Sequence, residues 1–184
     1  MGLVLLDRDG VINQDSPHYI RALDEWVPIP GSLAAIGRLN AHGWQVAICT
    51  NQSGIDRGLI TWSTLEAIHE RLGEGARAHG GEIEAFFVCP HTDEAGCSCR
   101  KPNPGLLKQA CVTFGVSPGD VVFIGDSSRD IEAARRAGAR PILVLTGNGN
   151  RTLINDEVPG YEVFADLASA VDALGPAPSQ GDAS

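Results

Sequence analysis

Positive charge is scarce in this sequence, which has 14 Lys and Arg residues against 23 Asp and Glu residues. The net charge of −9 and the lack of a basic or aromatic track disfavour an extended nucleic-acid-binding face. An anionic substrate must therefore be attracted by a local cluster of cations. Aromatic residues make up only 5% of the chain, but the 43% hydrophobic fraction and the mean hydropathy of −0.03 are typical of a soluble globular domain.

Long hydrophobic runs are also missing, so no window is suited to crossing a membrane. Asp7 and Arg8 interrupt the N-terminal apolar run, and we therefore expect no signal peptide. Five cysteines without a secretory signal favour reduced thiols or metal ligands over disulfides. From these features we expect a cytoplasmic protein that contacts neither membranes nor nucleic acid.

The stretch LVLLDRDGVIN, residues 3–13, combines a buried-strand pattern with a charged turn. Four apolar residues run directly into Asp7 and Asp9, which are separated by one position. In a strand-like backbone these two carboxylates point to the same side. Taken alone, the pattern is equally typical of a strand that ends in a solvated Asp-Gly turn.

The rest of the chain alternates between helix and strand patterns. Further strands are predicted over residues 44–49, 83–88, 121–124 and 142–145, and helices over 32–41, 63–79, 103–114, 128–137 and 166–174. Ser32 is the expected cap of the first helix, and Ser63 with Glu66 forms a capping-box pattern for the second. This alternation predicts a mainly parallel sheet covered on both faces, in one domain over residues 1–175 with a flexible tail over 176–184.

Polar residues follow several of these strands where each strand ends. Thr50 and Asn51 end the second strand, and Asp126 follows the fourth. Because parallel strands end at one edge of a sheet, we expect these residues to meet Asp7 and Asp9. Each motif alone has a plainer explanation, namely a polar turn or, at residues 126–127, a helix cap. Together they offer oxygen ligands, which suit Mg²⁺ better than zinc.

Arg100 and Lys101 stand at the head of the third predicted helix. A lysine can place a point charge on a phosphoryl group, and the planar arginine fork suits a phosphate or a hydroxylated substrate. As an isolated pair they would be typical of a solvated surface.

Residues 89–103 fit neither a helix nor a strand, and they contain the pattern C-x-H-x5-C-x-C. Cys89, His91, Cys97 and Cys99 match a closed tetrahedral zinc site. The alternatives are buried free thiols, or two disulfides beside an unrelated histidine. With four protein ligands such a zinc is structural, and it fixes the loop that carries Arg100. We interpret Cys49 and Cys111 as packed thiols, and His42, His69 and His79 as residues without a functional role.

The segments DRDGV, TNQSG, RKPNPG and GDSSRD occur in the order of the four motifs of the haloacid dehalogenase (HAD) superfamily of phosphohydrolases, which the chain resembles from about residue 3 to 146. The resemblance implies a three-layer α/β/α Rossmann-like HAD fold. It also implies that Asp7 is the nucleophile that forms an aspartyl-phosphate and that Asp9 is the general acid and base. Thr50 and Lys101 would hold the phosphoryl oxygens.

The same resemblance implies a catalytic Mg²⁺ held by Asp7, by the backbone carbonyl of Asp9 and by Asp126, with Asp130 in a supporting role. The short segment between Asp9 and Ala47 leaves no room for an inserted cap domain, so an open site is expected. Specificity would then come from the loops at 14–21, 52–59 and 89–100. The candidate substrate-binding residues there are Asp15, His18, Asn51, Ser53, Arg57 and Arg100.

As a capless phosphatase with such a zinc loop, the chain resembles two groups of the superfamily. One acts on a heptose bisphosphate and the other on histidinol phosphate. The opening DRDGVINQD and the block CPH…CSCRKPNPG resemble the heptose group more. We therefore expect a monomeric phosphatase that takes a small phosphosugar. A phosphosugar-binding protein without catalysis and a nucleic-acid end phosphatase remain the alternatives, the latter disfavoured by the net charge.

Overall fold

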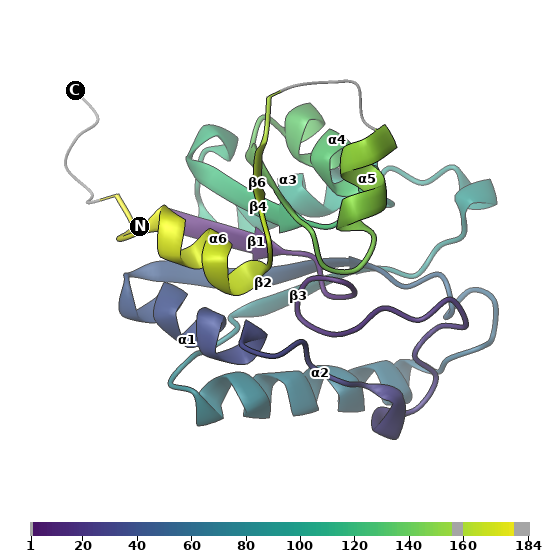
Figure 1. Ribbon diagram of the computed structural model, residues 1–184. Helices are drawn as coiled ribbons and strands as arrows, with labels where there is room; N and C mark the ends of the chain where they lie inside the picture. Colours follow the sequence, from purple (N-terminus) through teal and green to yellow (C-terminus); the bar gives the residue numbers. More distant parts are fainter. Residues whose placement is uncertain (1, 156–159, 179–184) are drawn as a thin grey trace.

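The computed structural model describes residues 2–155 and 160–178 as a three-layer α/β/α arrangement around one sheet (Figure 1). The strands are β1 (Gly2–Leu6), β2 (Trp44–Asn51), β3 (Ala85–Cys89), β4 (Val121–Gly125), β5 (Arg140–Val144) and β6 (Glu162–Phe164). The α-helices are α1 (Ser32–Ala41), α2 (Trp62–Ala78), α3 (Gly105–Phe114), α4 (Ser128–Ala137), α5 (Gly149–Asn155) and α6 (Leu167–Leu174). Short 3-10 turns cover Leu23–Glu25, Asp93–Ala95 and Pro118–Asp120.

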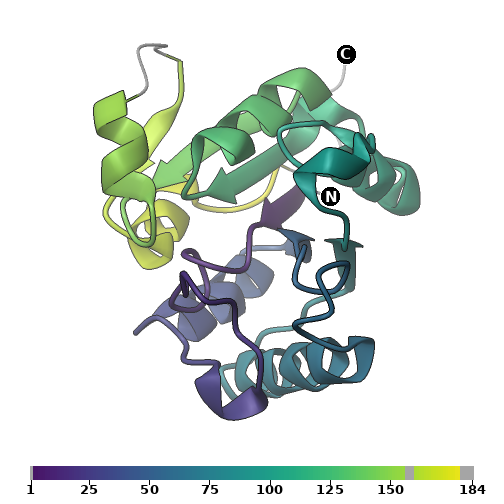
Figure 2. The same cartoon turned by 90° about the vertical axis from the view of Figure 1, so that its right-hand side faces the viewer.

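The six strands are all parallel, in the order β3-β2-β1-β4-β5-β6. The chain leaves the central strand β1 in one direction to build β2 and β3, and later returns to its other side with β4. Such a reversal of strand order opens a crevice at the carboxyl ends of the central strands, where open α/β sheets bind ligands. The backbone N–H of Asp7 donates to the carbonyl of Ile124 at 2.9 Å, so β1 and β4 stay paired up to this crevice. Figure 2 looks toward the loops at this edge.

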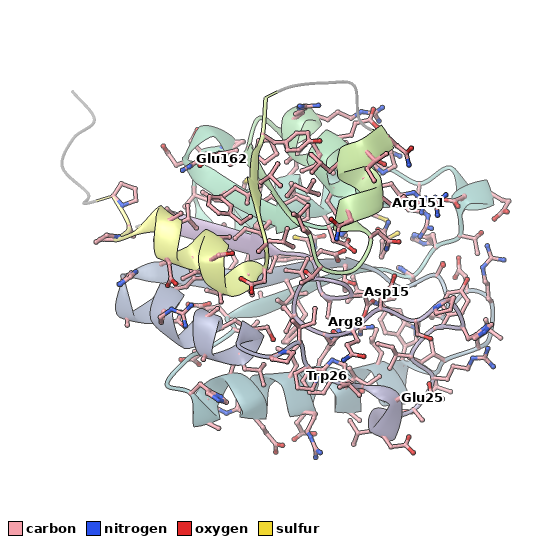
Figure 3. All side chains as sticks on the ribbon, in the orientation of Figure 1. Arg8, Asp15, Glu25, Trp26, Arg151 and Glu162 are labelled. Atoms are coloured by element: carbon pink, nitrogen blue, oxygen red, sulfur yellow. The ribbon has the colours of Figure 1, made fainter. Side chains whose placement is uncertain are left out.

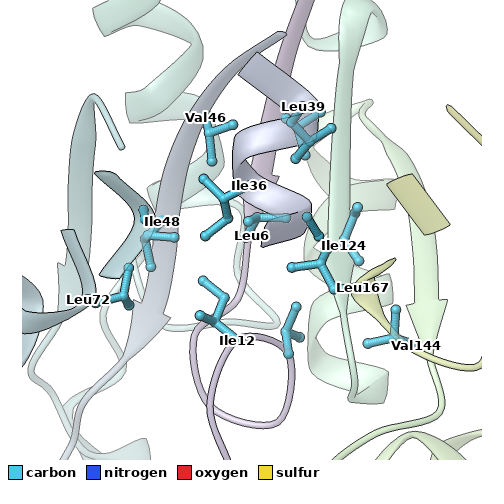
Figure 4. Close-up of a cluster of buried hydrophobic side chains, with 14 of the residues drawn as sticks. Leu6, Ile12, Ile36, Leu39, Val46, Ile48, Leu72, Ile124, Val144 and Leu167 are labelled. Atoms are coloured by element: carbon cyan, nitrogen blue, oxygen red, sulfur yellow. The ribbon is translucent and has the colours of Figure 1, made fainter. Parts of the chain in front are cut away.

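Each face of the sheet has its own hydrophobic core, because side chains alternate along a strand. Val4 and Leu6 of β1 lie in the core under α1, α2 and α6, where Figure 4 shows Leu6 among Ile36, Ile48 and Ile124. Leu3 and Leu5 lie in the second core, under α3 and α4. All four side chains are 0% exposed, which confirms the prediction of a buried first strand.

Two predicted helix starts are wrong in detail. Helix α2 is capped by Thr61, whose hydroxyl accepts the N–H of Thr64, and not by a box of Ser63 and Glu66. At α1 the cap position is Gly31, while Ser32 is the first helical residue and donates its hydroxyl to the carbonyl of Ile12 at 2.6 Å. At α2 the neighbouring Thr61 satisfies the helix end, whereas Gly31 at α1 makes no side-chain cap and Ser32 serves a tertiary contact instead.

The C-terminal quarter is the part that the sequence pattern described least well. Helix α5 and strand β6 were not predicted, because both are short and lack an apolar period. Ala177 donates its N–H to the carbonyl of His42 at 2.8 Å, so the chain stays packed beyond the predicted domain end at 175. The remaining predicted tail, residues 179–184, lies outside the described residues. None of the helices in the described ranges is long and apolar enough to cross a bilayer.

Candidate active site

The carboxyl ends of β1, β2 and β4 open into a cleft of about 650 Å³. The cleft is lined by predicted site residues from four segments that are far apart in the sequence: Asp7, Asp9, Asp15, Asn51, Ser53, Arg100, Lys101, Asp126 and Asp130. Figure 3 shows Asp15 and Arg151, another lining residue, on the side of the molecule where the strands end. The convergence expected from the parallel sheet is therefore confirmed.

Lys101 forms ion pairs with two carboxylates of the cleft, those of Asp7 and Asp130. Its Nζ lies 2.8 Å from Asp7 Oδ1 and 2.7 Å from Asp130 Oδ1, and the residue is only 2% exposed. Burial would lower the pKa of Lys101, but the two carboxylates outweigh burial and raise it. Lys101 is therefore a permanent cation against Asp7, which is the charge that an anionic substrate needs in so acidic a protein.

Asp130 lies in the first turn of α4, four residues after Asp126, and both of its carboxylate oxygens are occupied. Its Oδ2 accepts the backbone N–H of Asp126 at 3.2 Å, the N–H of Ser127 at 3.0 Å and the Ser127 hydroxyl at 2.6 Å, while Oδ1 pairs with Lys101. The plainer explanation of this segment, a helix cap, is thus also true. Asp130 orients Lys101 and closes the start of α4 at once, and its oxygens are occupied by the protein.

Asp9 is held by side chains that the motif analysis did not single out. Arg8 grips the carboxylate with Nε at 3.0 Å from Oδ1 and Nη2 at 3.0 Å from Oδ2. Asn13 donates to Oδ1 and Gln52 to Oδ2, both at 2.8 Å. Burial would raise the pKa of Asp9, but Arg8 and these donors hold it below its usual range.

Asp126, directly after β4, meets the loop that follows β5. Its Oδ2 accepts the backbone N–H of Asn148 at 2.7 Å, and its carbonyl accepts the Thr152 hydroxyl at 2.9 Å. A Cβ atom at Gly10 or Gly147, both at positive φ, would lie within 2.2 Å of Asp126 Oδ2, so only glycine fits beside this carboxylate. In the sequence, the predicted end of the fifth strand near residue 146 is what indicated a loop at this edge of the sheet.

The carboxylates of Asp7, Asp126 and Asp130 offer oxygens that lie within 4.8 Å of one another. Burial and the neighbouring carboxylates raise the pKa of Asp7, and burial together with Asp130 raises that of Asp126 to about 7. Crowded acidic oxygens of this kind fit a hard divalent cation such as Mg²⁺, which would relieve their repulsion. Since the protein already saturates Asp130, Asp7 and Asp126 are the side chains that fit as ligands.

The second group lies in the irregular loop after β3. The Sγ atoms of Cys89, Cys97 and Cys99 are 3.3 to 3.7 Å apart, and His91 Nδ1 lies 3.6 Å from Cys89 Sγ and 3.3 Å from Cys99 Sγ. These separations are far too long for disulfides, and all five cysteines are free thiols. They approach the spacing of about 3.8 Å that ligand sulfurs have around a tetrahedral zinc. The four groups therefore fit a closed zinc site.

This loop also arranges arginines at the mouth of the cleft. Arg100 donates to Asp93 Oδ1 at 2.6 Å and to the carbonyl of His91 at 3.1 Å. Asp93 lies 3.6 Å from Arg129, and Glu94 lies 3.9 Å from Arg57. Arg57 is thus placed at the loop and is not part of the cleft lining, whereas Arg100 and Arg129 line it.

The remaining predicted residues lie at different depths. The Thr50 hydroxyl is buried beneath the cleft, outside the residues that line it, and accepts from Gln52 at 2.9 Å, while Gln52 itself lines the cleft. The side-chain amide of Asn51 exchanges two hydrogen bonds of 3.1 Å with the backbone of Lys101, so it aligns the lysine segment. Asp15 accepts from Asn148 at 3.1 Å, while His18 is exposed and outside the lining of the cleft.

The predictions for the cysteines and for one histidine outside the four motifs had different outcomes. Cys49 and Cys111 are packed thiols as predicted, and burial raises the pKa of both. His69 was given no functional role, but it lies 3.5 Å from the guanidinium of Arg8 and stacks on Phe86. Its place on the buried face of a helix gave no sign of that neighbour.

Comparison with known proteins gives a consistent result. Residues 98–170 match the HAD-hydrolase-like family. The chain is 51% identical to a D-glycero-beta-D-manno-heptose-1,7-bisphosphate 7-phosphatase of Pseudomonas aeruginosa, over 94% of this chain and 97% of that protein. A protein of the same name from Pseudomonas putida is 50% identical over 95% of this chain and 99% of the relative.

A solved structure shares the fold closely. It is the D,D-heptose 1,7-bisphosphate phosphatase from B. bronchiseptica in complex with magnesium and phosphate, with a TM-score of 0.92 and 46% identity over 95% of this chain and 98% of that one. The corresponding protein from Burkholderia thailandensis has a TM-score of 0.75 and 41% identity, over 95% of this chain and 98% of that one.

Proposed function

The chain belongs to the family of D-glycero-D-manno-heptose-1,7-bisphosphate 7-phosphatases, which are HAD-like phosphatases, and we propose that it removes the 7-phosphate of this heptose bisphosphate. The product would be the heptose 1-phosphate, a precursor of the lipopolysaccharide core. The observation that carries the proposal is the Lys101 bridge between Asp7 and Asp130, which gives a nucleophile, a cation and a support in one cleft.

In the first half of the reaction, a carboxylate oxygen of Asp7 attacks phosphorus, and the bond from phosphorus to the sugar oxygen breaks. Asp9, whose pKa is held low in the substrate-free fold, would take up a proton as the negatively charged phosphate binds beside it, and it would give that proton to the leaving alkoxide. In the second half, Asp9 takes a proton from water as the water attacks the aspartyl-phosphate, which releases phosphate and restores Asp7. Lys101 contacts Asp7 Oδ1 at 2.8 Å and would stabilise the negative charge on the transferred group throughout, together with Thr50.

Two metals fit the described residues. Mg²⁺ would be held by Asp7, Asp126 and the backbone carbonyl of Asp9, and it would supply positive charge to the phosphoryl oxygens. Magnesium is present in the related B. bronchiseptica structure. Zn²⁺ would be held by Cys89, His91, Cys97 and Cys99 and would keep the Arg100 loop folded.

Sugar recognition would come from the rim of an open, capless cleft. Asp15, Asn51, Ser53 and Arg100 line the cleft and are the proposed contacts, while His18 and Arg57 would reach the substrate only from its edge. We further propose that residues 1–175, with the packed residues just beyond them, form one catalytic domain that acts as a monomer in the cytoplasm. Light scattering and cell fractionation test the last two statements.

The test of the proposed function is phosphate release in the presence of Mg²⁺ from three substrates at equal concentration. They are the β and α anomers of D-glycero-D-manno-heptose 1,7-bisphosphate and histidinol phosphate. We expect the highest kcat/KM for the heptose bisphosphate, with the β anomer preferred, since the relatives above carry that anomer in their names. A higher kcat/KM for histidinol phosphate would contradict the proposed substrate, and no release from any of the three would contradict a phosphatase.

A further inference from the structure

Arg8 is a buried cation that lies in the sequence between the two proposed catalytic residues Asp7 and Asp9, and the mechanism above gives it no task. It is 1% exposed and is not part of the cleft lining, so it does not reach a substrate. Figure 3 labels Arg8 on the same side of the molecule as Asp15. Burial of a guanidinium costs free energy unless the group is paired and hydrogen-bonded, so Arg8 needs a partner inside the fold.

That partner is Asp9, and two nitrogens of the guanidinium contact its carboxylate. Nε lies 3.0 Å from Asp9 Oδ1, while Nη2 lies 2.9 Å from Oδ1 and 3.0 Å from Oδ2, so both oxygens are reached. The amides of Asn13 and Gln52 then add one donor to each oxygen at 2.8 Å. Rotation of the carboxylate about its Cβ–Cγ bond would break all of these bonds, so its plane is fixed.

One residue of α2 and one of β3 hold the Arg8 guanidinium in place. His69 Nε2 lies 3.5 Å from Arg8 Nη1, and the His69 ring stacks on Phe86 with centroids 4.2 Å apart and planes inclined by 12°. Burial and the charge of Arg8 lower the pKa of His69 to about 3, so the imidazole is neutral and Nε2 accepts from the guanidinium. The sequence of supports therefore runs from Phe86 through His69 and Arg8 to Asp9.

We propose that Arg8, backed by His69, is a positioning residue that aims the Asp9 carboxylate at the leaving oxygen of the substrate. The inference rests on the proposed phosphatase mechanism but not on the identity of the sugar. A purely structural role, in which Arg8 only neutralises a buried charge, makes a different prediction. A lysine could supply that charge, whereas it could not supply N–H donors from two separate nitrogen atoms to the same carboxylate.

The two roles separate when the leaving group is varied. Phenyl phosphate and 4-nitrophenyl phosphate are similar in shape, but phenolate leaves poorly without a proton and 4-nitrophenolate leaves readily without one. The kcat/KM value reports only the steps up to cleavage of the ester bond, so the later use of Asp9 as a base does not enter. An aimed Asp9 therefore matters for phenyl phosphate and for the heptose bisphosphate, and little for 4-nitrophenyl phosphate.

The experiment measures kcat/KM of wild-type protein and of Arg8→Lys, in Mg²⁺, with these three substrates. We expect Arg8→Lys to lower the value about 10- to 100-fold for phenyl phosphate and the heptose bisphosphate, with little change for 4-nitrophenyl phosphate. Asp9→Asn should show the same selectivity with a larger loss. Arg38→Lys is the matched control, since Arg38 pairs with the exposed Asp172 at 3.0 Å, and it should behave as wild type.

An equal loss on all three substrates, or no loss on any, would overturn the positioning role. Thermal unfolding shows whether Arg8→Lys is folded. If it is not, His69→Phe keeps the stacking on Phe86 but removes the acceptor for Arg8, and it must show the same selectivity in smaller measure or the proposal fails. Failure of the phosphatase proposal is seen separately, as wild-type protein that releases no phosphate.

Discussion

The two candidate metal groups of this protein are built in opposite ways. Asp7, Asp126 and Asp130 come from two strand ends and the start of a helix, and the fold holds them in place before any cation binds. The other four candidate ligands lie within residues 89–99: Cys89 ends β3, and the other three lie in the loop that follows, whose regular structure is the turn Asp93–Ala95. At the first group the fold makes the metal site. At the second, a metal would make the local fold.

Removal of the Asp7 nucleophile should have the largest effect on activity, and it should not lower the stability of the fold. Asp7→Asn should lower phosphate release by about 10⁴-fold or more. Because burial and neighbouring carboxylates raise the pKa of Asp7, its ionised form is disfavoured in the metal-free fold, and a neutral amide should leave the Tm equal or higher. Phosphate release and calorimetry without metal check both parts, with the exposed Asp120→Asn as control. A variant that retains wild-type rates would refute the assignment.

Lys101 pairs with two members of the carboxylate group, Asp7 and Asp130, so its loss should affect both activity and stability. Lys101→Met should lower kcat by about 10²- to 10³-fold, as a transition-state charge is no longer balanced. It should also destabilise the fold by about 3 to 5 kcal/mol, because Asp7 and Asp130 lose their buried partner. Denaturant unfolding and steady-state kinetics measure the two effects. Lys108→Met, on the exposed face of α3, should change neither, and a normal kcat in Lys101→Met would contradict the role.

A zinc ligand should instead affect stability and KM more than the chemical step. Cys97→Ala should release the metal, lower the Tm and raise KM about 10-fold, because the loop that carries Arg100 loosens while Asp7 and Asp126 keep their places. Cys111→Ala is the matched control, since Cys111 is a buried thiol outside the metal group and should leave the zinc content unchanged. If Cys97→Ala kept both its zinc content and its Tm, the loop would not depend on metal.

A change outside both groups should alter stability alone and by the smallest amount. Thr61→Ala removes the hydroxyl that accepts the N–H of Thr64 at the start of α2 and should cost about 1 kcal/mol. Neither metal content nor kcat/KM should change. Ser63→Ala is its control, because it keeps the Thr61 cap and removes only the 2.9 Å contact between the two hydroxyls. A fall in kcat/KM of Thr61→Ala without a fall in stability would show that the active site depends on this helix end directly.

Much of the fold and of the cleft was predictable because both follow from strand ends. An apolar run that stops at Asp7 or Asp126 places a carboxylate at the sheet edge without any knowledge of distant contacts. The four candidate zinc ligands were predictable for a different reason: they lie close together in the sequence and their spacing is that of a metal site.

The supports of these residues were not predictable. The fork between Arg8 and Asp9 joins adjacent residues, yet the sequence does not show that Arg8 turns inward to His69. Asn148 meets Asp126 only because β5 lies beside β4, and helix α5 that follows has no apolar period. Such contacts depend on tertiary packing, which the local pattern does not encode.

The comparison of the two metal groups is tested most directly by metal content measured together with activity. The protein is dialysed against a mild chelator, analysed for metals and assayed with the heptose bisphosphate before and after Mg²⁺ is added. The account predicts about one zinc retained per chain, from the closed four-ligand site, no activity without Mg²⁺, and full activity when Mg²⁺ alone is restored. Phosphate release without Mg²⁺, or a fully active protein that contains no zinc, would contradict it.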